Sequence, residues 1–309
     1  MHGSYQLGKN ILATITYYDV LGFPLTAFEI WKHLMSWSPA HRLCDQPCTL
    51  GAVSAMLTSE QLVSRIDTYN GFYFLRGRGF LVAARIQAEK TSVSKLKRMH
   101  FLVKILRMVP YVRMIGATGS LAMKNGDQGS DWDMFVVLRS GRIWTGRTLL
   151  TGFLHVLGKR RHGKKIKDRV CLNYFVTENN LEIGTKDFFS AHEYRFFIPL
   201  MNQGLFQKFE LKNFWIREFR PNFELSLVPS FWTLADSSVF RRIQSILERM
   251  CNNVDKEQWL ASWQKRKIER NPKTHLSGSL IEANDRALIF LPCPRGPKVF
   301  EKFKSRLSI

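Results

Sequence analysis

The stretch that decides the fold reads Thr118-Gly119-Ser120-Leu121-Ala122 and, after a short loop, Ser130-Asp131-Trp132-Asp133-Met134-Phe135-Val136-Val137-Leu138. The apolar run Tyr111–Ala117 leads directly into the first half and predicts a strand. The intervening loop, residues 125–130, is rich in turn residues, and the apolar run after Asp131 predicts a second strand. The stretch therefore predicts strand, turn and strand, with a Gly-Ser and two aspartates at the junctions.

Two carboxylates are expected on one face of the second strand. Asp131 and Asp133 are two positions apart, and side chains with this spacing point to the same side of a strand. Adjacent carboxylates repel each other unless a cation neutralises them, and Mg²⁺ prefers such oxygen ligands. Gly119 permits a close backbone approach, and a helix beginning near Ser120 would direct free N–H groups at phosphate oxygens. These residues predict a site for a metal ion and phosphate groups.

Together the two pairs resemble the motif of the DNA polymerase β-like nucleotidyltransferase superfamily. In that family a Gly-Ser is followed, about ten residues later, by an Asp-x-Asp between apolar residues. Here ten residues separate Ser120 from Asp131, and the resemblance covers roughly residues 112–176. It implies that Asp131 and Asp133 are catalytic and bind Mg²⁺ or Mn²⁺. It also implies that Gly119 and Ser120 contact the phosphates of a bound NTP.

The strand expected next departs from the family pattern. The family usually carries a third carboxylate there, which binds metal and accepts the proton of the attacking hydroxyl. The run Arg169–Val176 has Asn173 at that position, on the same face as Cys171, while Leu172 and Tyr174 alternate with them. An amide oxygen still ligates metal, so Asn173 is a candidate catalytic residue. It has too little basicity to act as a general base.

Two functions of different classes therefore stay open. The first is an enzyme that transfers a nucleoside monophosphate from an NTP to an unidentified acceptor, RNA or another polyanion among them, with the base supplied by substrate or water. The alternative is a catalytically impaired nucleotidyltransferase scaffold that binds nucleotide or nucleic acid in a regulatory role. Asp168, at the entrance of the third strand, would replace the missing base only in an unusual geometry.

Positive charge is concentrated in the middle of the chain. The net charge is +21, and residues 90–180 hold +13 of it, whereas residues 1–89 hold +1 and residues 181–309 hold +7. The middle third is therefore expected to attract anions, and the N-terminal third is nearly neutral.

The densest basic run lies just before the third expected strand and reads Lys159, Arg160, Arg161, Lys164, Lys165, Lys167 and Arg169. It suits a funnel for a triphosphate or a nucleic-acid acceptor as well as it suits a solvated, mobile loop. Lys164 and Lys165, together with Ser130 before the acidic pair, are the remaining candidate nucleotide-binding residues. No RNA-binding aromatic signature accompanies the run.

Residues 1–85 are expected to form a small helical domain with a hairpin. The expected elements are helices at Asn10–Val20, Thr26–Leu34 and Thr49–Glu60, and strands at Leu62–Ile66 and Phe72–Leu75. The Asn70-Gly71 step favours a hairpin turn, and three helices followed by a hairpin resemble a winged helix. The third helix contains no Lys or Arg. We therefore expect packing or protein contact from this unit rather than DNA binding.

Helices are expected to dominate the rest of the chain. A long helix at Lys90–Met108 has an apolar stripe, and a second helix, Ile143–Leu157, follows the acidic strand. The charges of the long helix are expected to lie on a solvated face, at Lys95, Lys97, Arg98, Lys104 and Arg107. Residues 187–305 are expected to be mostly helical, and the aromatic side chains of residues 186–203 are expected to lie in the core. The region 186–222 also resembles the segment after the catalytic domain in bacterial relatives.

The expected fold class is α+β, with a small mixed sheet. A nucleotidyltransferase domain at residues 90–184 would be flanked by the winged-helix-like domain at residues 1–85 and by a helical C-terminal domain at residues 185–309. No basic segment with a following apolar run opens the chain, and no apolar stretch is long enough to span a bilayer. Five cysteines suit reduced thiols. We therefore expect a cytoplasmic protein without a membrane partner.

Overall fold

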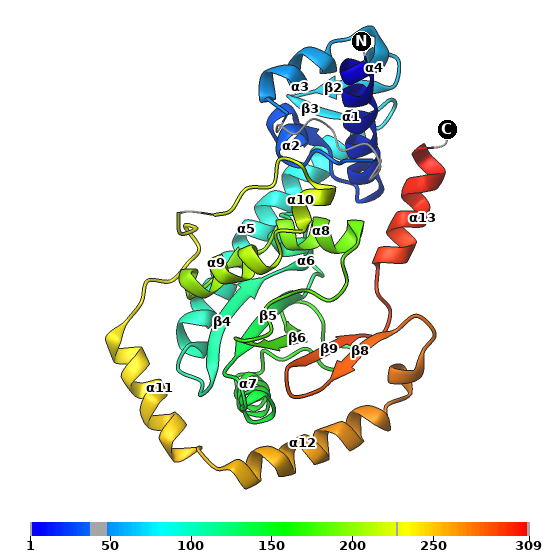
Figure 1. Cartoon of the computed structure of the whole chain (residues 1–309). Helices are drawn as coiled ribbons and strands as arrows, with labels where there is room; N and C mark the ends of the chain where they lie inside the picture. The colour runs from blue at the N-terminus through cyan, green and yellow to red at the C-terminus, as the bar shows by residue number, and fades with distance from the viewer. Residues whose placement is uncertain (1, 38–47, 227, 308–309) are drawn as a thin grey trace.

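A computed structural model describes residues 2–37, 48–226 and 228–307 (Figure 1). The chain folds around a mixed sheet with the strand order β7-β4-β5-β6-β9-β8. Its strands are β4 (Val112–Ala117), β5 (Trp132–Leu138), β6 (Val170–Thr177), β7 (Ile198–Pro199), β8 (Leu280–Ala283) and β9 (Ala287–Leu291). Strands and helices both belong to one mixed α+β architecture, as the sequence predicted.

The three central strands bring the ends of distant segments together. β4 and β5 are antiparallel, so the carboxyl end of β4 lies beside the start of β5. β5 and β6 are parallel, because the helix α7 (Ile143–Val156) crosses between them and returns the chain to the same end. The start of β6, the start of β5 and the end of β4 therefore meet at one end of the sheet.

Side chains alternate along β5 between two separate cores. Trp132, Met134, Val136 and Leu138 pack with residues of α5 (Phe80–Leu106) and α7 on one face. Phe135 and Val137 pack on the other face, against α9 (Gln203–Lys212). Both faces of the strand are covered, which explains its nearly continuous apolar sequence. Helix α5 begins ten residues earlier than the expected start at Lys90.

The C-terminal part of the chain is less helical than the sequence predicted. β7 pairs with β4, and the β8–β9 hairpin pairs with β6, so this region completes both edges of the central sheet. The sequence did not predict these strands, because they are short and their partners are distant in sequence. Tyr174, for example, pairs with Ile289. The aromatic side chains of residues 186–203 do contribute to the core, as Phe197 shows by its burial.

The remaining helices lie outside the sheet, some along its strands and others toward the N-terminal part. They are α6 (Gly119–Ala122), α8 (Phe188–Arg195), α10 (Ile216–Phe219), α11 (Ser238–Met250), α12 (Val254–Glu269), the 3-10 helix Pro272–His275 and α13 (Gly296–Leu307). Figure 1 shows α11 and α12 as a belt along the outside of α7 and the strands. α13 then returns to the N-terminal part of the chain, where Phe303 is fully buried and Arg306 pairs with Asp19.

The N-terminal part contains α1 (His2–Val20), α2 (Ala27–Lys32), α3 (Leu50–Leu57) and α4 (Glu60–Val63) with a sheet in the order β1-β3-β2. Its strands are β1 (Leu25–Thr26), β2 (Ile66–Tyr69) and β3 (Phe72–Leu75). The predicted capping box is confirmed: Thr26 accepts from the Glu29 N–H at 3.2 Å, and Glu29 accepts from the Thr26 N–H at 2.9 Å. Thr49 caps α3 through the Ala52 N–H.

One predicted strand of this region is wrong. Residues 62 and 63 belong to α4, and the first hairpin strand begins only at Ile66. Asn70 and Gly71 both have positive φ, at 51° and 76°, so the turn holds only these two residues and Tyr69 pairs directly with Phe72. A two-residue turn of this kind fixes where each strand ends.

Among the described residues, no helix combines the length and apolar composition that a bilayer span requires.

Candidate functional site

The junction of β4, α6 and β5 positions the two aspartates. Asp131 directly precedes β5, and Asp133 is the second residue of that strand. Thr118 donates its backbone N–H to the Asp133 carbonyl at 3.1 Å, which places the Gly119 turn beside the acidic pair. Gly119 has a φ of +65°, and a Cβ atom there would collide with the Asp133 carboxylate. The close approach expected at Gly119 is therefore made by Asp133 itself, and only glycine allows it.

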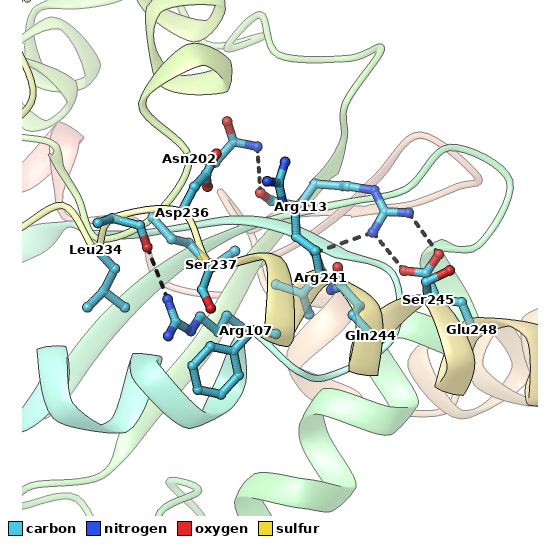
Figure 2. Close-up of a pocket in the computed structure, with 14 residues that line it drawn as sticks. Arg107, Arg113, Asn202, Leu234, Asp236, Ser237, Arg241, Gln244, Ser245 and Glu248 are labelled. Atoms are coloured by element: carbon cyan, nitrogen blue, oxygen red, sulfur yellow. Dashed lines mark hydrogen bonds and ion pairs between the residues drawn. The ribbon is translucent and has the colours of Figure 1, made fainter.

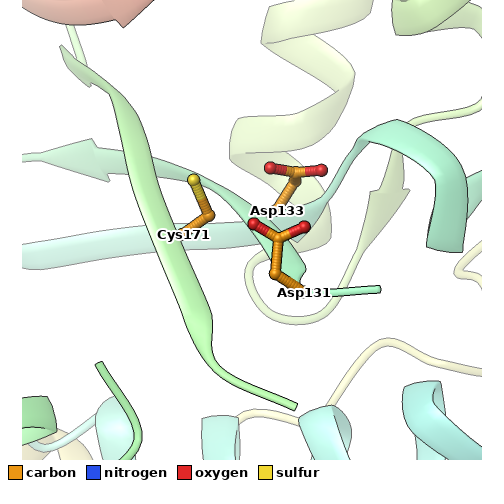
Figure 3. Close-up of side chains that lie close together, drawn as sticks. All are labelled: Asp131, Asp133 and Cys171. Carbon is orange, nitrogen blue, oxygen red and sulfur yellow. The ribbon is translucent and has the colours of Figure 1, made fainter. Parts of the chain in front are cut away.

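A cysteine completes a cluster of possible metal ligands. One oxygen of Asp131, one oxygen of Asp133 and the Sγ atom of Cys171 all lie within 4.8 Å of one another (Figure 3). Ligand atoms this close are able to surround one divalent cation. Carboxylate oxygens suit Mg²⁺ and Mn²⁺, whereas a thiolate favours softer ions such as Zn²⁺. The residues fit a metal ion, and Cys171 moves the preference away from Mg²⁺ toward softer cations.

The structure places Cys171, and not Asn173, opposite Asp133. The register pairs Asp133 with Cys171 and Phe135 with Tyr174, so β6 holds one extra residue between the two pairs. This bulge breaks the regular alternation. As a result, Tyr174 stacks on Phe135, with ring centroids 4.8 Å apart. The expected alternation, which put Asn173 in the place of the third acid, is wrong for this reason.

One arginine of the basic run reaches the cluster. Arg161 Nη1 donates to Asp131 Oδ2 at 2.5 Å and lies 3.5 Å from Cys171 Sγ. Its backbone is fixed alongside β6, because the Arg161 N–H donates to the Val170 carbonyl at 2.9 Å and the Val170 N–H donates to the Lys159 carbonyl at 2.7 Å. This part of the basic run is therefore held in place, and Arg161 partly balances the charge of the carboxylates.

The pKa values of the cluster reflect burial and like charge. Burial raises the pKa of Asp133 to about 6, and the Asp131 carboxylate acts in the same direction, while Cys171, Arg295 and Arg161 oppose it. Burial also raises the pKa of Cys171 to about 12, with the charges of Asp133 and Asp131 adding to the effect. Such perturbed groups cluster at functional sites, and a bound cation would lower both pKa values.

A further carboxyl group near the cluster comes from α8. Burial raises the pKa of Glu193 to about 7, and the charge of Asp133 raises it further, while Arg295 opposes the shift. Sequence reasoning missed Glu193 because it lies within the aromatic run that was expected to form core. The available signal was a carboxylate within an apolar run, because burial of an unpaired carboxylate costs free energy.

The loop before the acidic pair is held by a buried lysine. Lys95 Nζ donates to the carbonyl oxygens of Gln128 and Ser130, at 2.9 and 2.6 Å, and lies 3.3 Å from Asp168 Oδ1. The expectation that Lys95 lies on a solvated face is wrong, since the residue is 2% exposed. Three acceptors compensate the burial of its charge. A helical charge pattern alone does not show which polar position is covered by a loop.

The other predicted site residues are only partly gathered at the cluster. Ser120 lies in the first turn of α6, directly after Gly119. The Ser130 hydroxyl donates to Asp127 Oδ1 at 2.8 Å, so it shapes the loop. Lys164 and Lys165 are exposed at a tight turn and, within the described part of the chain, pair with neither carboxylate.

Asp168 is not available as a substitute base. Its carboxylate pairs with Arg98 at 3.0 Å as well as with Lys95 at 3.3 Å. These two cations hold the pKa of Asp168 below its usual value even though burial acts to raise it. The group is thus a structural anchor for the start of β6 rather than a proton acceptor.

The opposite end of the sheet carries a pocket in which several polar side chains bind one another or the backbone. A cavity of about 310 Å³ lies between the start of β4 and α11 (Figure 2). Arg113 forms a bidentate pair with Glu248, at 2.7 and 3.1 Å. Arg107 donates to the Ala235 carbonyl at 3.1 Å, and Gln244 donates to the first carbonyl of β4 at 2.8 Å. These contacts hold α11 against the sheet, so we assign the residues around the pocket a structural role.

Comparisons of the chain with protein-family models, with curated proteins and with solved structures found no match. A functional assignment therefore has to come from the geometry of the acidic cluster and its surroundings.

Proposed function

We propose that the chain is a metal-dependent nucleotidyltransferase of the polymerase β-like class. It would transfer a nucleoside monophosphate from an NTP to a hydroxyl, phosphate or nucleic-acid acceptor, and pyrophosphate would leave. The observation that carries the proposal is the pair of carboxylates of Asp131 and Asp133, held against the Gly119 turn at the start of β5. The mixed sheet with its crossover helix α7 supports it. We also propose a cytoplasmic location, because free cysteines such as Cys171 and Cys293 are typical of that compartment.

The chain's own residues would divide the work of binding the nucleotide. Asp131, Asp133 and Cys171 would hold a divalent cation, which supplies charge neutralisation and Lewis-acid chemistry at a triphosphate when bound. The backbone N–H groups after Gly119 would bind phosphate oxygens. Arg161 would exchange its Asp131 partner for a phosphate oxygen, because a guanidinium pairs well with either anion.

Proton transfer from an attacking hydroxyl would fall to a group of the substrate or to water. β6 brings a thiol rather than a carboxylate to the cluster, and Asp168 is engaged with two cations. The lack of a carboxylate from β6 distinguishes the proposed site from that of polymerase β-like enzymes that carry the base on the third strand.

A second candidate is a scaffold that binds nucleotide without turnover. Cys171 in the position of the third acid and the Arg161–Asp131 ion pair favour it. A winged-helix role in DNA binding is not favoured, although the order of α1 to α3 and the β2–β3 hairpin suits that fold. α3 has no basic residue. Arg78, near the hairpin, forms an ion pair with the buried Asp19, in which Nε lies 2.7 Å from Oδ1.

The deciding experiment is nucleotide transfer by the pure protein. The protein is incubated with each α-³²P-labelled NTP, Mg²⁺ or Mn²⁺, and total cellular RNA or protein extract. We expect label on an acceptor, and we expect it to vanish in the Asp131→Ala/Asp133→Ala variant. Metal-dependent NTP binding without transfer to any acceptor would reject the enzyme and leave the scaffold.

A further inference from the structure

A row of aromatic and basic side chains lies on the outer side of α12. Residues three and four positions apart on a helix are neighbours on its surface. The row with this spacing contains Lys256, Trp259, Trp263, Arg266, Lys267 and Arg270, and each of these residues is exposed. Trp259 is 62% exposed and Trp263 is 44% exposed, although tryptophan is on average a well-buried residue. An exposed tryptophan pair of this kind needs an explanation.

The two tryptophan rings present parallel faces next to positive charge. Their planes differ by 3°, and their centroids are 6.3 Å apart. Lys267 Nζ lies 5.3 Å from the centroid of the Trp263 ring. Flat aromatic faces beside cations are the features with which proteins bind single-stranded nucleic acid, because every base has a stacking face and every nucleotide has a phosphate.

The fold does not require the outer row. The opposite side of α12 fastens the helix to α7: Glu257 accepts from the Trp144 and Thr145 N–H groups at 2.9 and 3.0 Å. Gln264 donates to the Trp144 carbonyl at 3.2 Å, and Leu260 packs against the main core. Because this inner side already holds the helix, the tryptophans are free to serve an interaction. Figure 1 shows α12 at the outer edge of the molecule, without another labelled element beyond it.

We infer that the outer row of α12 binds single-stranded nucleic acid, with bases stacked on Trp259 and Trp263 and phosphates paired with Lys256, Arg266, Lys267 and Arg270. The row contains two apolar side chains and four cations. It therefore lacks the continuous apolar face with which a helix enters a lipid surface. Of the three carboxylates of α12, Glu257 is turned to α7, whereas Asp255, one turn before Trp259, and Glu269, one turn after Arg266, lie at the edges of the row, where the four cations outnumber them.

The inference deepens the proposed function, because it names single-stranded nucleic acid as the acceptor class. Only this identification of the acceptor rests on the proposed function. α12 covers the start of α7, which follows the carboxyl end of β5, whereas Asp131 lies at the opposite end of that strand. The row would therefore anchor a polymer at a distance from the cluster. Binding itself does not depend on Asp131 or Asp133.

The test is binding of a fluorescein-labelled single-stranded oligouridine, followed by anisotropy without NTP. We expect the full-length protein to bind it, and we expect Trp259→Ala/Trp263→Ala to weaken affinity at least about tenfold, since each of the two lost stacking contacts contributes about fivefold or more. Arg266→Glu/Lys267→Glu should weaken it similarly and flatten the dependence on salt. Phe231→Ala, at a residue that is 90% exposed elsewhere, is the matched control and should bind like wild type. Circular dichroism checks that each variant is folded.

Three outcomes would overturn the inference. They are no binding by the wild type, equal binding by the tryptophan variant, and loss in that variant only of partition into anionic phosphatidylserine vesicles. The Asp131→Ala/Asp133→Ala variant separates the two proposals. It should retain oligouridine binding even if the chain proves to lack transferase activity.

Discussion

The two ends of the central sheet differ in how their charged side chains are arranged. At one end Asp131 and Asp133 lie close together beside the Cys171 thiol, and Arg161 is the cation in direct contact with them. At the other end Glu248 accepts from Arg113 at 2.7 Å and from the Tyr111 N–H at 2.8 Å. The first end concentrates like charge, and the second end pairs the Glu248 carboxylate with Arg113 and Arg139.

This difference separates residues that serve stability from residues that serve function. A paired polar group inside a fold stabilises it, whereas a pair of adjacent carboxylates destabilises it unless a ligand supplies charge. Folded proteins tolerate such a conflict mainly where function requires it. Substitutions at the acidic end should therefore change activity more than stability, and substitutions at the paired end should do the reverse.

The largest expected effect comes from making the acidic end more acidic. Cys171→Asp would place a third carboxylate opposite Asp133, where it would bind metal and accept a proton. We expect nucleotide transfer to rise by about 100-fold or more, the usual contribution of a positioned general base. The rate of label transfer measures it. Asn173→Asp is the matched control and should give a smaller gain, because the bulge separates that residue from Asp133. A larger gain from Asn173→Asp would contradict the register of β6.

The second prediction concerns stability and pH. Burial raises the pKa of Asp133 from 3.8 to about 6, so the folded state holds this proton more tightly than the unfolded state. The resulting stability is present below about pH 4 and is lost as the pH rises through 6. Asp133→Asn should therefore raise the free energy of unfolding at pH 8 by up to about 3 kcal/mol. Urea unfolding at both pH values measures it. The exposed Asp236→Asn serves as control, and a loss of stability in Asp133→Asn at pH 8 would refute the prediction.

The third prediction concerns the paired end of the sheet. Glu248→Ala removes the acceptor of the Tyr111 N–H and the partner of Arg113. Leaving a buried donor without an acceptor costs about 2 kcal/mol. We expect that loss in the free energy of unfolding by urea, with label transfer unchanged under folding conditions. Glu301→Ala, at an exposed position of α13, should cost much less. A transfer rate that falls in the folded Glu248→Ala protein would break the division between the two ends.

The smallest expected effect concerns the cation that the chain itself places at the acidic end. Arg161 and a metal ion compete for Asp131, so Arg161→Ala should increase the affinity for Mn²⁺ without NTP. A partly exposed ion pair is worth up to about 1 kcal/mol, which corresponds to a gain of about fivefold. Titration calorimetry measures the affinity, with the exposed Lys164→Ala as control. A weaker affinity for Mn²⁺ in Arg161→Ala would show that the arginine organises the site instead of competing for it.

The sequence predicted the two strands beside the acidic pair, but it did not predict which side chains surround that pair. Strong local patterns, such as the apolar run before Gly119 and the run after Asp131, predicted β4 and β5 correctly. The choice between Cys171 and Asn173 depended on one extra residue in β6, and a shift by one residue moves a side chain to the other face. No periodic pattern reveals such a bulge.

Other parts of the structure depend on contacts between distant segments. Lys95 is buried because a loop more than thirty residues later covers it. β9 pairs with β6 across more than a hundred residues, and its short run gave no sign of its partner. The basic run was expected to be an anion funnel or a solvated loop, and the sequence does not distinguish its seven members. The backbone hydrogen bonds beside Val170 bring Arg161 to the acidic pair.

Mn²⁺ binding by titration calorimetry, with and without a non-hydrolysable ATP analogue, tests the central claim most directly. The wild-type protein should bind Mn²⁺ saturably and more tightly in the presence of the analogue. Asp131→Ala/Asp133→Ala should lose this binding while its free energy of unfolding stays equal or rises, because a pair of like charges is removed. Equal Mn²⁺ binding by the double variant, or no binding by the wild type under either condition, would contradict the assignment of the acidic end as a metal and nucleotide site.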